Sequence, residues 1–433
     1  MKWFGSSGVR GVSFEDFSIE LSMRIGYATG SRYRDIVIGR DGRITGQIFL
    51  SAISSAIMSM GANACDVGIL PTPSLAYATR DRDCGVMITA SHNPPEYNGV
   101  KLWNPDGSSF DTRQMEDIES LMMSEHELAD WSSVGSLKTD SNAIHDHSEG
   151  ILARVGESKI KVVVDCANGP ASLITPYVLE NMGCRVTTLN AQIDGSFPGR
   201  PAEPAEENLS ALRNAVLHAH ADLGIAHDGD ADRMVAIDDK GRYAGGDVLL
   251  KVFAKQVGAK SIVAPIDATM VLEDWFSDRL YRTRVGDAFV SEKVKERNAD
   301  FGGEPSGTWI FPEMSLCPDG IFAAAKLVEI CAKKRLSELV DSVPSLPMIK
   351  ETISFKSSIR DEIISNLNEK IASVESTEVD RTDGYRLRFE DGWALIRLSG
   401  TEPKIRIAVE ARTMQRAKEI MERMMKVARS CLK

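Results

Sequence analysis

The sequence has no apolar run approaching the roughly 18 residues that a membrane-spanning helix needs. Its first residues, Met1-Lys2-Trp3-Phe4-Gly5, lead directly into serine and glycine, without the apolar core of a signal peptide. An excess of positive charge is also missing, because 51 basic against 62 acidic side chains give a net charge of −11. We therefore expect no membrane or nucleic-acid partner, and a protein that remains in the cytoplasm.

Paired cysteines are missing as well. The seven cysteines are odd in number and never form a C-x-x-C pair, so the sequence predicts neither a disulfide framework nor a thiolate metal site. This usage is typical of a reducing compartment such as the cytoplasm. The cysteines stand at positions 65, 84, 166, 184, 317, 331 and 431.

What the chain does have is enough length and apolar content for several cores. Its 433 residues are 43% hydrophobic and 26% charged, which is typical of globular proteins. A chain of this length usually divides into domains of about 100 to 200 residues, about three here.

One β-α-β pattern occurs three times, at residues 36–67, 162–189 and 261–285. In each copy a short apolar strand precedes a helix, and a second strand follows. The repeats predict three tandem α/β domains with mixed sheets whose helices cover the sheet faces. The last eighty or so residues differ and predict a small α+β domain. Its expected elements are helices at 361–371 and 414–428 and strands at 385–389, 393–398 and 404–409.

Four loops that follow strand-like segments are the candidates for chemistry, since ligands in open α/β sheets bind beyond the strand ends. The first, residues 89–95, reads TASHNPP. Ser91 lies on a turn stiffened by two prolines, which suits a nucleophile that presents its oxygen in one direction. His92 is not expected to serve as its base, because adjacent side chains on a turn usually point apart.

The second loop, residues 227–233, reads HDGDADR and carries Asp228, Asp230 and Asp232. Three carboxylates at alternate positions repel one another unless a cation gathers them, and hard oxygen ligands select Mg²⁺ or Ca²⁺. An EF-hand is excluded, because Arg233 stands where that calcium loop requires glycine and no glutamate closes the loop. Three ligands leave room for water and a phosphate, which indicates Mg²⁺.

The other two loops either offer sugar and phosphate contacts or are, respectively, a plain glycine turn and a capping turn before a strand. Residues 302–308 read GGEPSGT, in which Glu304 and Ser306 supply an acceptor and a donor suited to sugar hydroxyls. Residues 397–403 read RLSGTEP, in which hydroxyls, free backbone N–H groups and arginine form a turn suited to a phosphate. A further glycine-rich turn at residues 5–11 contains Arg10.

In this order, the motifs TASHNP, DGDADR, GEPSG and RLSGTEP resemble the α-D-phosphohexomutases, the family of phosphoglucomutase, phosphomannomutase and phosphoglucosamine mutase. The resemblance covers the whole chain. It implies four domains around a central cleft: residues 1–145 with a phosphoserine loop, 146–246 with a metal loop, 247–350 with a sugar loop, and 351–433 with a phosphate-binding loop.

The resemblance also implies roles for individual residues. Ser91 would carry the phosphoryl group and would join the three aspartates as a ligand of one Mg²⁺ per subunit. Lys101, Arg10 and Arg233 would be basic catalytic groups near the phosphoserine. In the sugar loop, this chain has Thr308 where many relatives place histidine. The implied substrate-binding residues are Glu304, Ser306, Arg397, Ser399, Gly400, Thr401 and Arg406.

The implied enzyme is an intramolecular phosphotransferase, an isomerase of small hexose phosphates that is a monomer or homodimer. It would interconvert a hexose 6-phosphate and 1-phosphate through phosphoserine, with a hexose 1,6-bisphosphate as intermediate and activator. The SGTEP sequence resembles phosphoglucosamine mutases more than the SNT form common in phosphomannomutases, so we expect glucosamine phosphate. A phosphomannomutase or phosphoglucomutase of broad specificity is the alternative; a sugar phosphatase and a non-catalytic sugar-phosphate binding protein are more distant ones.

Overall fold

The computed structural model describes residues 3–5, 8–399 and 403–432, which group into two compact units. The first unit contains residues 1–259 and 286–342, and the second contains residues 260–285 and 343–433. The chain therefore contributes two separate segments to each unit. Among the helices of the described ranges, none combines the length and apolar character that a membrane crossing requires.

The first sheet of the first unit has six strands in the order β1-β5-β4-β2-β3-β6. Its strands β2, β3, β4 and β6 are parallel, whereas β5 runs antiparallel to its two neighbours, β4 and β1. The strands are β1 (Val9–Val12), β2 (Asp35–Arg40), β3 (Asn63–Ile69), β4 (Cys84–Ile88), β5 (Tyr97–Trp103) and β6 (Leu137–Thr139).

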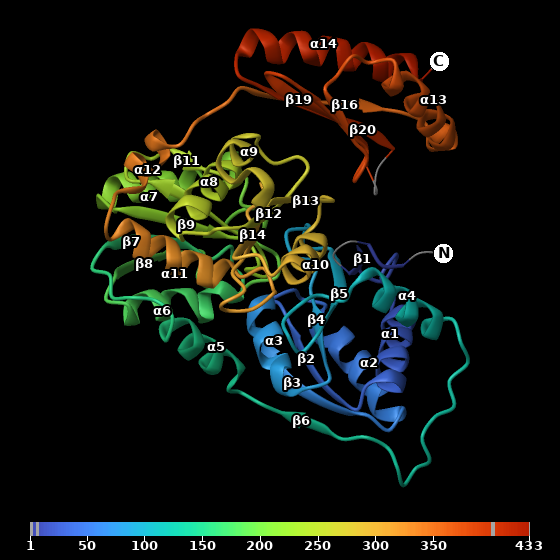
Figure 1. Cartoon of the computed structure of the whole chain (residues 1–433). Coiled ribbons are helices and arrows are strands. Elements are labelled where there is room, and N and C mark those ends of the chain that lie inside the picture. Colours follow the sequence, from blue (N-terminus) through green and yellow to red (C-terminus); the bar gives the residue numbers. More distant parts are fainter. Residues whose placement is uncertain (1–2, 6–7, 400–402, 433) are drawn as a thin grey trace. The chain divides into compact units, whose positions relative to one another are not determined.

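Helices cover both faces of this sheet because apolar side chains alternate along β2. Ile36 and Ile38 pack with α1, α2 and α4, whereas Val37 packs on the opposite face with α3 and α5. Figure 1 shows α1 and α2 on one side of the sheet and α3 on the other. The helices are α1 (Ile19–Arg32), α2 (Gly46–Ser59), α3 (Thr72–Ala78), α4 (Thr112–Met122) and α5 (Ala143–Leu152).

The second sheet of this unit has the order β11-β10-β9-β7-β8. Strands β8, β7 and β9 are parallel, and β10 returns antiparallel to β9. Helix α7 packs on one face through Leu212 and Val216. The elements are β7 (Lys161–Asp165), α6 (Thr175–Asn181), β8 (Arg185–Leu189), α7 (Ser210–Ala219), β9 (Leu223–His227), β10 (Met234–Asp238) and β11 (Tyr243–Ala244).

The rest of the first unit is mainly helical, and its α11 packs against β9, β10 and α6. A short antiparallel pair, β14 and β15, flanks the predicted sugar loop. The elements are α8 (Gly246–Gln256), α10 (Asp287–Arg297), β14 (Phe301–Gly303), β15 (Trp309–Ile310), α11 (Gly320–Cys331) and α12 (Leu336–Ser342).

The second unit combines the third β-α-β copy with the C-terminal domain. The five-stranded antiparallel sheet β16-β20-β19-β18-β17 uses its two faces differently. Ala394 and Ile396 pack under α13 and α14, whereas Trp393 and Leu395 pack against Ile266 and Met270. The elements are β12 (Ile262–Pro265), α9 (Val271–Phe276), β13 (Leu280–Thr283), β16 (Met348–Ser354), α13 (Arg360–Ala372), β17 (Glu378–Asp380), β18 (Tyr385–Phe389), β19 (Gly392–Leu398), β20 (Lys404–Ala411) and α14 (Met414–Ser430).

The seven cysteines are all free and buried. Burial raises the pKa of the Cys166 and Cys331 thiols to about 12, so both are protonated near neutral pH.

Candidate active site

Ser91 lies in the loop after β4, at the carboxyl end of that strand, and is almost fully buried. Its φ of 51° is in the left-handed region, which a residue with a side chain seldom adopts. The Ser91 hydroxyl donates to the Asp228 Oδ2 atom over 2.7 Å. The serine and the aspartate loop, predicted separately from sequence, are therefore in direct contact.

A glycine makes this contact possible. A Cβ atom on Gly229 would lie 2.5 Å from the Ser91 carbonyl oxygen, closer than real Cβ contacts allow. The second position of the DGDADR motif must therefore lack a side chain if the two loops are to meet.

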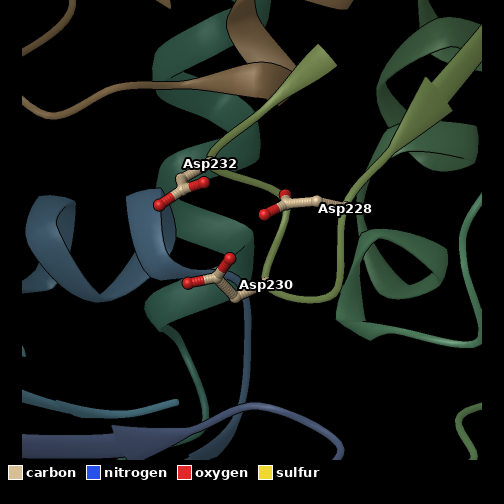
Figure 2. Close-up of side chains that lie close together, drawn as sticks. All are labelled: Asp228, Asp230 and Asp232. Carbon is tan, nitrogen blue, oxygen red and sulfur yellow. The ribbon is translucent and has the colours of Figure 1, made fainter. Parts of the chain in front are cut away.

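The carboxylates of Asp228, Asp230 and Asp232 face one another from the single loop between β9 and β10 (Figure 2). All three side chains are buried, and each contributes an oxygen to a group of atoms within 4.8 Å of one another. Burying three like charges this closely is unfavourable unless positive groups compensate them.

One positive group is Lys101 on β5. Its ammonium contacts the Oδ2 atoms of both Asp230, at 3.0 Å, and Asp232. The Thr72 hydroxyl, at the start of α3, also donates to Asp230 Oδ2 over 2.6 Å. Lys101 and Thr72 therefore orient two of the three carboxylates, and both act through Oδ2 atoms.

The opposite oxygens fit a metal ion. Across the described ranges, Asp230 Oδ1 and Asp232 Oδ1 are buried without a hydrogen-bond donor. Asp228 Oδ1 accepts from the Arg233 backbone N–H at 3.1 Å. Buried, hard oxygen atoms left without a donor are what Mg²⁺ requires, so the donor set fits that ion.

The aspartates differ in their affinity for protons. Burial, together with the charges of Asp232 and Asp230, raises the pKa of Asp228 well above its usual value. Burial and the Asp230 charge also raise the pKa of Asp232. Burial acts in the same direction on Asp230, but Lys101 and Thr72 outweigh it, and the pKa of Asp230 is lowered.

His92 corrects one expectation from the sequence. Its Nδ1 lies 3.4 Å from the Ser91 Oγ atom, so the two adjacent side chains do not point apart. The left-handed backbone at Ser91 brings them to the same side. Burial, with Arg233 and Arg10 nearby, lowers the pKa of His92 to about 2, so the ring is neutral near pH 7.

Two further predicted basic residues lie beside the serine and aspartate loops. Arg10, on β1, donates to the Asn93 side chain in the serine loop over 3.3 Å. Arg233 closes the aspartate loop and donates to both oxygens of Glu203, at 3.1 and 3.2 Å. Both cations lie close enough to His92, the residue after Ser91, to act on its pKa.

The predicted sugar loop adjoins the aspartate loop, because Arg233 forms an isolated β-bridge with Thr308. Ser306 is exposed at the tip of this loop. Glu304 is buried and accepts from the Gly286 N–H over 2.8 Å and from the Thr308 hydroxyl over 2.9 Å. Thr308 therefore helps to orient the carboxylate that the sequence assigns to sugar hydroxyls.

The fourth predicted loop belongs to the second unit. Arg397 and Arg406 lie opposite each other on β19 and β20, and Arg397 is paired with Asp383 at 3.0 Å. Ser399 is buried, and its carbonyl accepts from Arg360. Gly400 and Thr401 lie outside the described residues.

Comparison with known proteins identifies relatives along the whole chain. Models described as phosphoglucomutase/phosphomannomutase match in order: α/β/α domain I at residues 1–129, domain II at 145–241, domain III at 245–346 and the C-terminal domain at 362–427.

Individual relatives are similar over nearly their full length. A probable phosphoglucosamine mutase of Methanocella arvoryzae is 48% identical, covering 100% of this chain and 99% of the relative. The phosphoglucosamine mutase of Methanocaldococcus jannaschii is 40% identical, with 99% and 98% covered. The crystal structure of a phosphoglucomutase/phosphomannomutase family protein of Burkholderia thailandensis has a TM-score of 0.87 and 26% identity, with 98% and 97% covered.

Proposed function

Since the chain belongs to the phosphoglucomutase/phosphomannomutase family, we propose that it is a phosphohexose mutase whose phosphoryl carrier is Ser91. The contact between the Ser91 hydroxyl and Asp228, inside a buried group of carboxylates, is the observation that supports this role best. The relatives named phosphoglucosamine mutase favour glucosamine 6-phosphate and glucosamine 1-phosphate as substrate and product. Mutase activity of broad hexose specificity is the alternative.

The reaction has two transfers. In the first, a free hydroxyl oxygen of the hexose monophosphate bonds to the phosphorus of phosphoserine, and the bond between phosphorus and Ser91 Oγ breaks. The hydroxyl loses one proton and the serine oxygen gains one. In the second transfer, Ser91 Oγ bonds to the phosphorus of the other phosphate of the 1,6-bisphosphate, and the bond between that phosphorus and its sugar oxygen breaks. The serine hydroxyl loses one proton and the sugar oxygen gains one, so the product is the isomeric monophosphate. Atoms and protons balance, and no redox partner is needed.

The residues of the site suit this chemistry, which depends mainly on positioning and charge neutralisation. Phosphoserine carries about −1.5 to −2 charges near neutral pH. Arg10 lies beside its loop and Lys101 lies against the aspartates. Asp228, Asp230 and Asp232 would hold Mg²⁺, which supplies further positive charge to the transferring phosphoryl group. Because His92 is neutral near pH 7, the positive charge near Ser91 would come from Arg10, Arg233 and Lys101.

The remaining predicted roles are part of the same proposal. Glu304 and Ser306 would bind sugar hydroxyls, and Arg397, Ser399, Gly400, Thr401 and Arg406 would bind the substrate's second phosphate. The anionic substrate would meet a chain of net charge −11, so these local cations would have to provide its attraction.

The first test is covalent. Peptide mass spectrometry of the purified protein after incubation with glucose 1,6-bisphosphate should place a phosphoryl group on Ser91. Ser91→Ala should abolish turnover and retain the circular dichroism spectrum. Ser31→Ala on α1, where the hydroxyl donates to the Ala28 carbonyl, is the control and should be fully active. Phosphate on a different serine, or an active Ser91→Ala variant, would contradict the assignment.

The second test is of specificity. Rates with glucosamine, mannose and glucose 6-phosphates, each with its bisphosphate activator, are compared side by side. The highest kcat/KM is expected for glucosamine 6-phosphate, and comparable values for all three would favour the broad mutase. Release of inorganic phosphate without isomer would indicate a phosphatase, and absence of any turnover a binding protein.

The third test is of the metal. Asp230→Asn should lower Mg²⁺ affinity, because the substitution replaces a charged oxygen ligand with a neutral one. Isothermal titration with Mg²⁺ measures the affinity directly and needs no substrate. An unchanged titration curve would remove Asp230 from the ligand set.

A further inference from the structure

Arg43, which belongs to none of the four loop motifs, is buried and extensively hydrogen-bonded to the loop that carries Ser91. It is 1% exposed and lies three residues after the end of β2. Its Nη1 donates to the carbonyl oxygens of Pro94, at 2.6 Å, and Tyr97, at 2.9 Å. Its Nη2 donates to those of Ser91, at 2.8 Å, and Asn93, at 2.7 Å. One guanidinium thus binds three carbonyls of the loop that carries the serine and the carbonyl of the first residue of β5.

The Nε atom of Arg43 completes the arrangement. It donates to Asp41 Oδ2 over 3.1 Å in an ion pair whose side chains are fully buried. A guanidinium has five N–H donors, and each of the five has an acceptor here. The ring of Phe197 lies 5.1 Å from the guanidinium carbon. Arg43 therefore has no donor left for a phosphate, which distinguishes it from Arg10 and Arg233.

Asp41 holds the other side of Ser91. The same Asp41 Oδ2 atom accepts from the Thr89 hydroxyl at 2.6 Å, and the Thr89 oxygen accepts from the Ser91 N–H at 2.8 Å. The N–H of Ser91 is thus fixed through Thr89, and its carbonyl is fixed by Arg43. Both contacts therefore depend on the buried ion pair between Arg43 and Asp41.

This double attachment explains how Ser91 retains an unfavourable backbone conformation. A serine with φ of 51° relaxes to the extended or helical region unless surrounding groups fix its peptide units. The fixed conformation also directs the Ser91 hydroxyl at Asp228, 2.7 Å away.

We propose that Arg43 is a positioning residue for phosphoryl transfer, which holds the Ser91 loop so that the Ser91 oxygen meets the phosphoryl group in line. The proposal rests on the mutase function proposed above. A displacement of about 1 Å at a reacting atom can cost about 100-fold in rate. Lysine can replace the arginine only in part, because its ammonium has three donors and lacks the planar fork.

The test compares Arg43→Gln and Arg43→Lys with the wild type in single turnover, by mass spectrometry of phosphoryl transfer from glucose 1,6-bisphosphate to Ser91. The rate should fall about 100-fold in Arg43→Gln and by less in Arg43→Lys. In steady state kcat should fall and KM should stay unchanged, because Arg43 has no donor left for the substrate. Amide hydrogen exchange of residues 91–97 should accelerate.

Ile57→Ala is the matched control for lost stability. Ile57 is fully buried on α2 in the same unit, in a core cluster whose described members include none of residues 89–96. This variant should unfold at a lower temperature yet retain the wild-type transfer rate and the wild-type exchange of residues 91–97.

The outcomes separate the two proposals. A folded Arg43→Gln or Arg43→Lys variant that phosphorylates Ser91 at the wild-type rate would overturn the role of Arg43 and leave the mutase function intact. If Arg43→Gln does not fold, the Arg43→Lys rate decides. A wild type without mutase activity would instead overturn the proposed function. In that case, unchanged hydrogen exchange at residues 91–97 in the Arg43 variants would show that Arg43 does not hold the Ser91 loop in place.

Discussion

At the scale of single residues, the two oxygens of one carboxylate can have different partners. Asp230 uses Oδ2 for Lys101 and Thr72 and keeps Oδ1 without a donor in the part of the chain that the structure describes. Partners that orient a ligand contribute to metal affinity although they do not touch the ion. In the proposed Mg²⁺ site, Thr72 would be such a partner.

Thr72→Val is therefore expected to weaken Mg²⁺ binding about 10-fold, because the Asp230 carboxylate loses the hydroxyl that orients it. Isothermal titration measures the change. Thr79→Val is the control: Thr79 is buried at the end of the same helix, and its hydroxyl bonds to the Leu75 carbonyl. Equal losses in the two variants would show a general effect on α3 and would contradict the specific role.

Only part of this arrangement was predictable from sequence. The three aspartates could be proposed because like charges at alternate positions of one loop need a cation, and the structure brings them together. Thr72 gave no local signal, since it lies 158 positions from Asp230 and meets it only in the folded chain. Arg43 had a weak signal, as the last residue of an Asp-Gly-Arg sequence after a strand, but its four carbonyl contacts depend on the loop's path.

At the scale of elements, one buried network connects three helices of the first unit. Asp319 caps α11 by accepting from the Ile321 and Phe322 N–H groups at 3.0 and 2.9 Å. It also lies 3.0 Å from His147 Nε2 on α5, whose Nδ1 lies 2.9 Å from the Ser74 hydroxyl on α3. The helix that carries Thr72 is thereby anchored to two others.

Asp319→Ala should lower the free energy of unfolding by about 3 kcal/mol, because it removes a helix cap and leaves the His147 ring buried without its partner. Urea denaturation followed by circular dichroism measures the change. Asp111→Ala removes the exposed cap of α4 in the same unit and should cost only about 1 kcal/mol. Equal costs would show that the contact with His147 contributes nothing.

Elements with a clear apolar pattern were predicted well. The predicted strand at 385–389 matches β18, and the helix predicted at 361–371 lies within α13. Strand β16 was missed, because its residues are largely exposed and include Lys350 and Glu351, so no apolar alternation marks it. Its strand conformation comes from backbone pairing with residues 404–410 of β20, which a local pattern does not contain.

At the scale of the whole molecule, the second unit is assembled from two segments that are distant in sequence. Glu410 on β20 joins them: its buried Oε2 accepts from the Trp393 Nε1 at 2.9 Å and from the Met270 backbone N–H at 2.7 Å. Local patterns could predict a β-α-β copy at 261–285 but not its packing against Glu410, which follows Met270 by 140 positions. The predicted domain boundaries, and the common cleft for all four loops, stay predictions.

Glu410→Ala should loosen residues 260–285, because it leaves two buried N–H groups without an acceptor, at a cost of about 1 to 3 kcal/mol for each group. Hydrogen exchange of peptides from this segment should accelerate. Glu410→Gln retains a carbonyl oxygen at the same place and should preserve most of the protection. Identical exchange in both variants would exclude the hydrogen bonds as the cause.

The burial of all seven thiols has a practical consequence. A thiol reagent can modify a cysteine only when its surroundings open, since both access and the thiolate form are suppressed in the native state. Cys84 and Cys317 lie in two different cores of the first unit, and Cys431 lies in the core of the second. The order in which brief alkylation labels them during gradual warming would report which part of the molecule melts first, without any engineered probe.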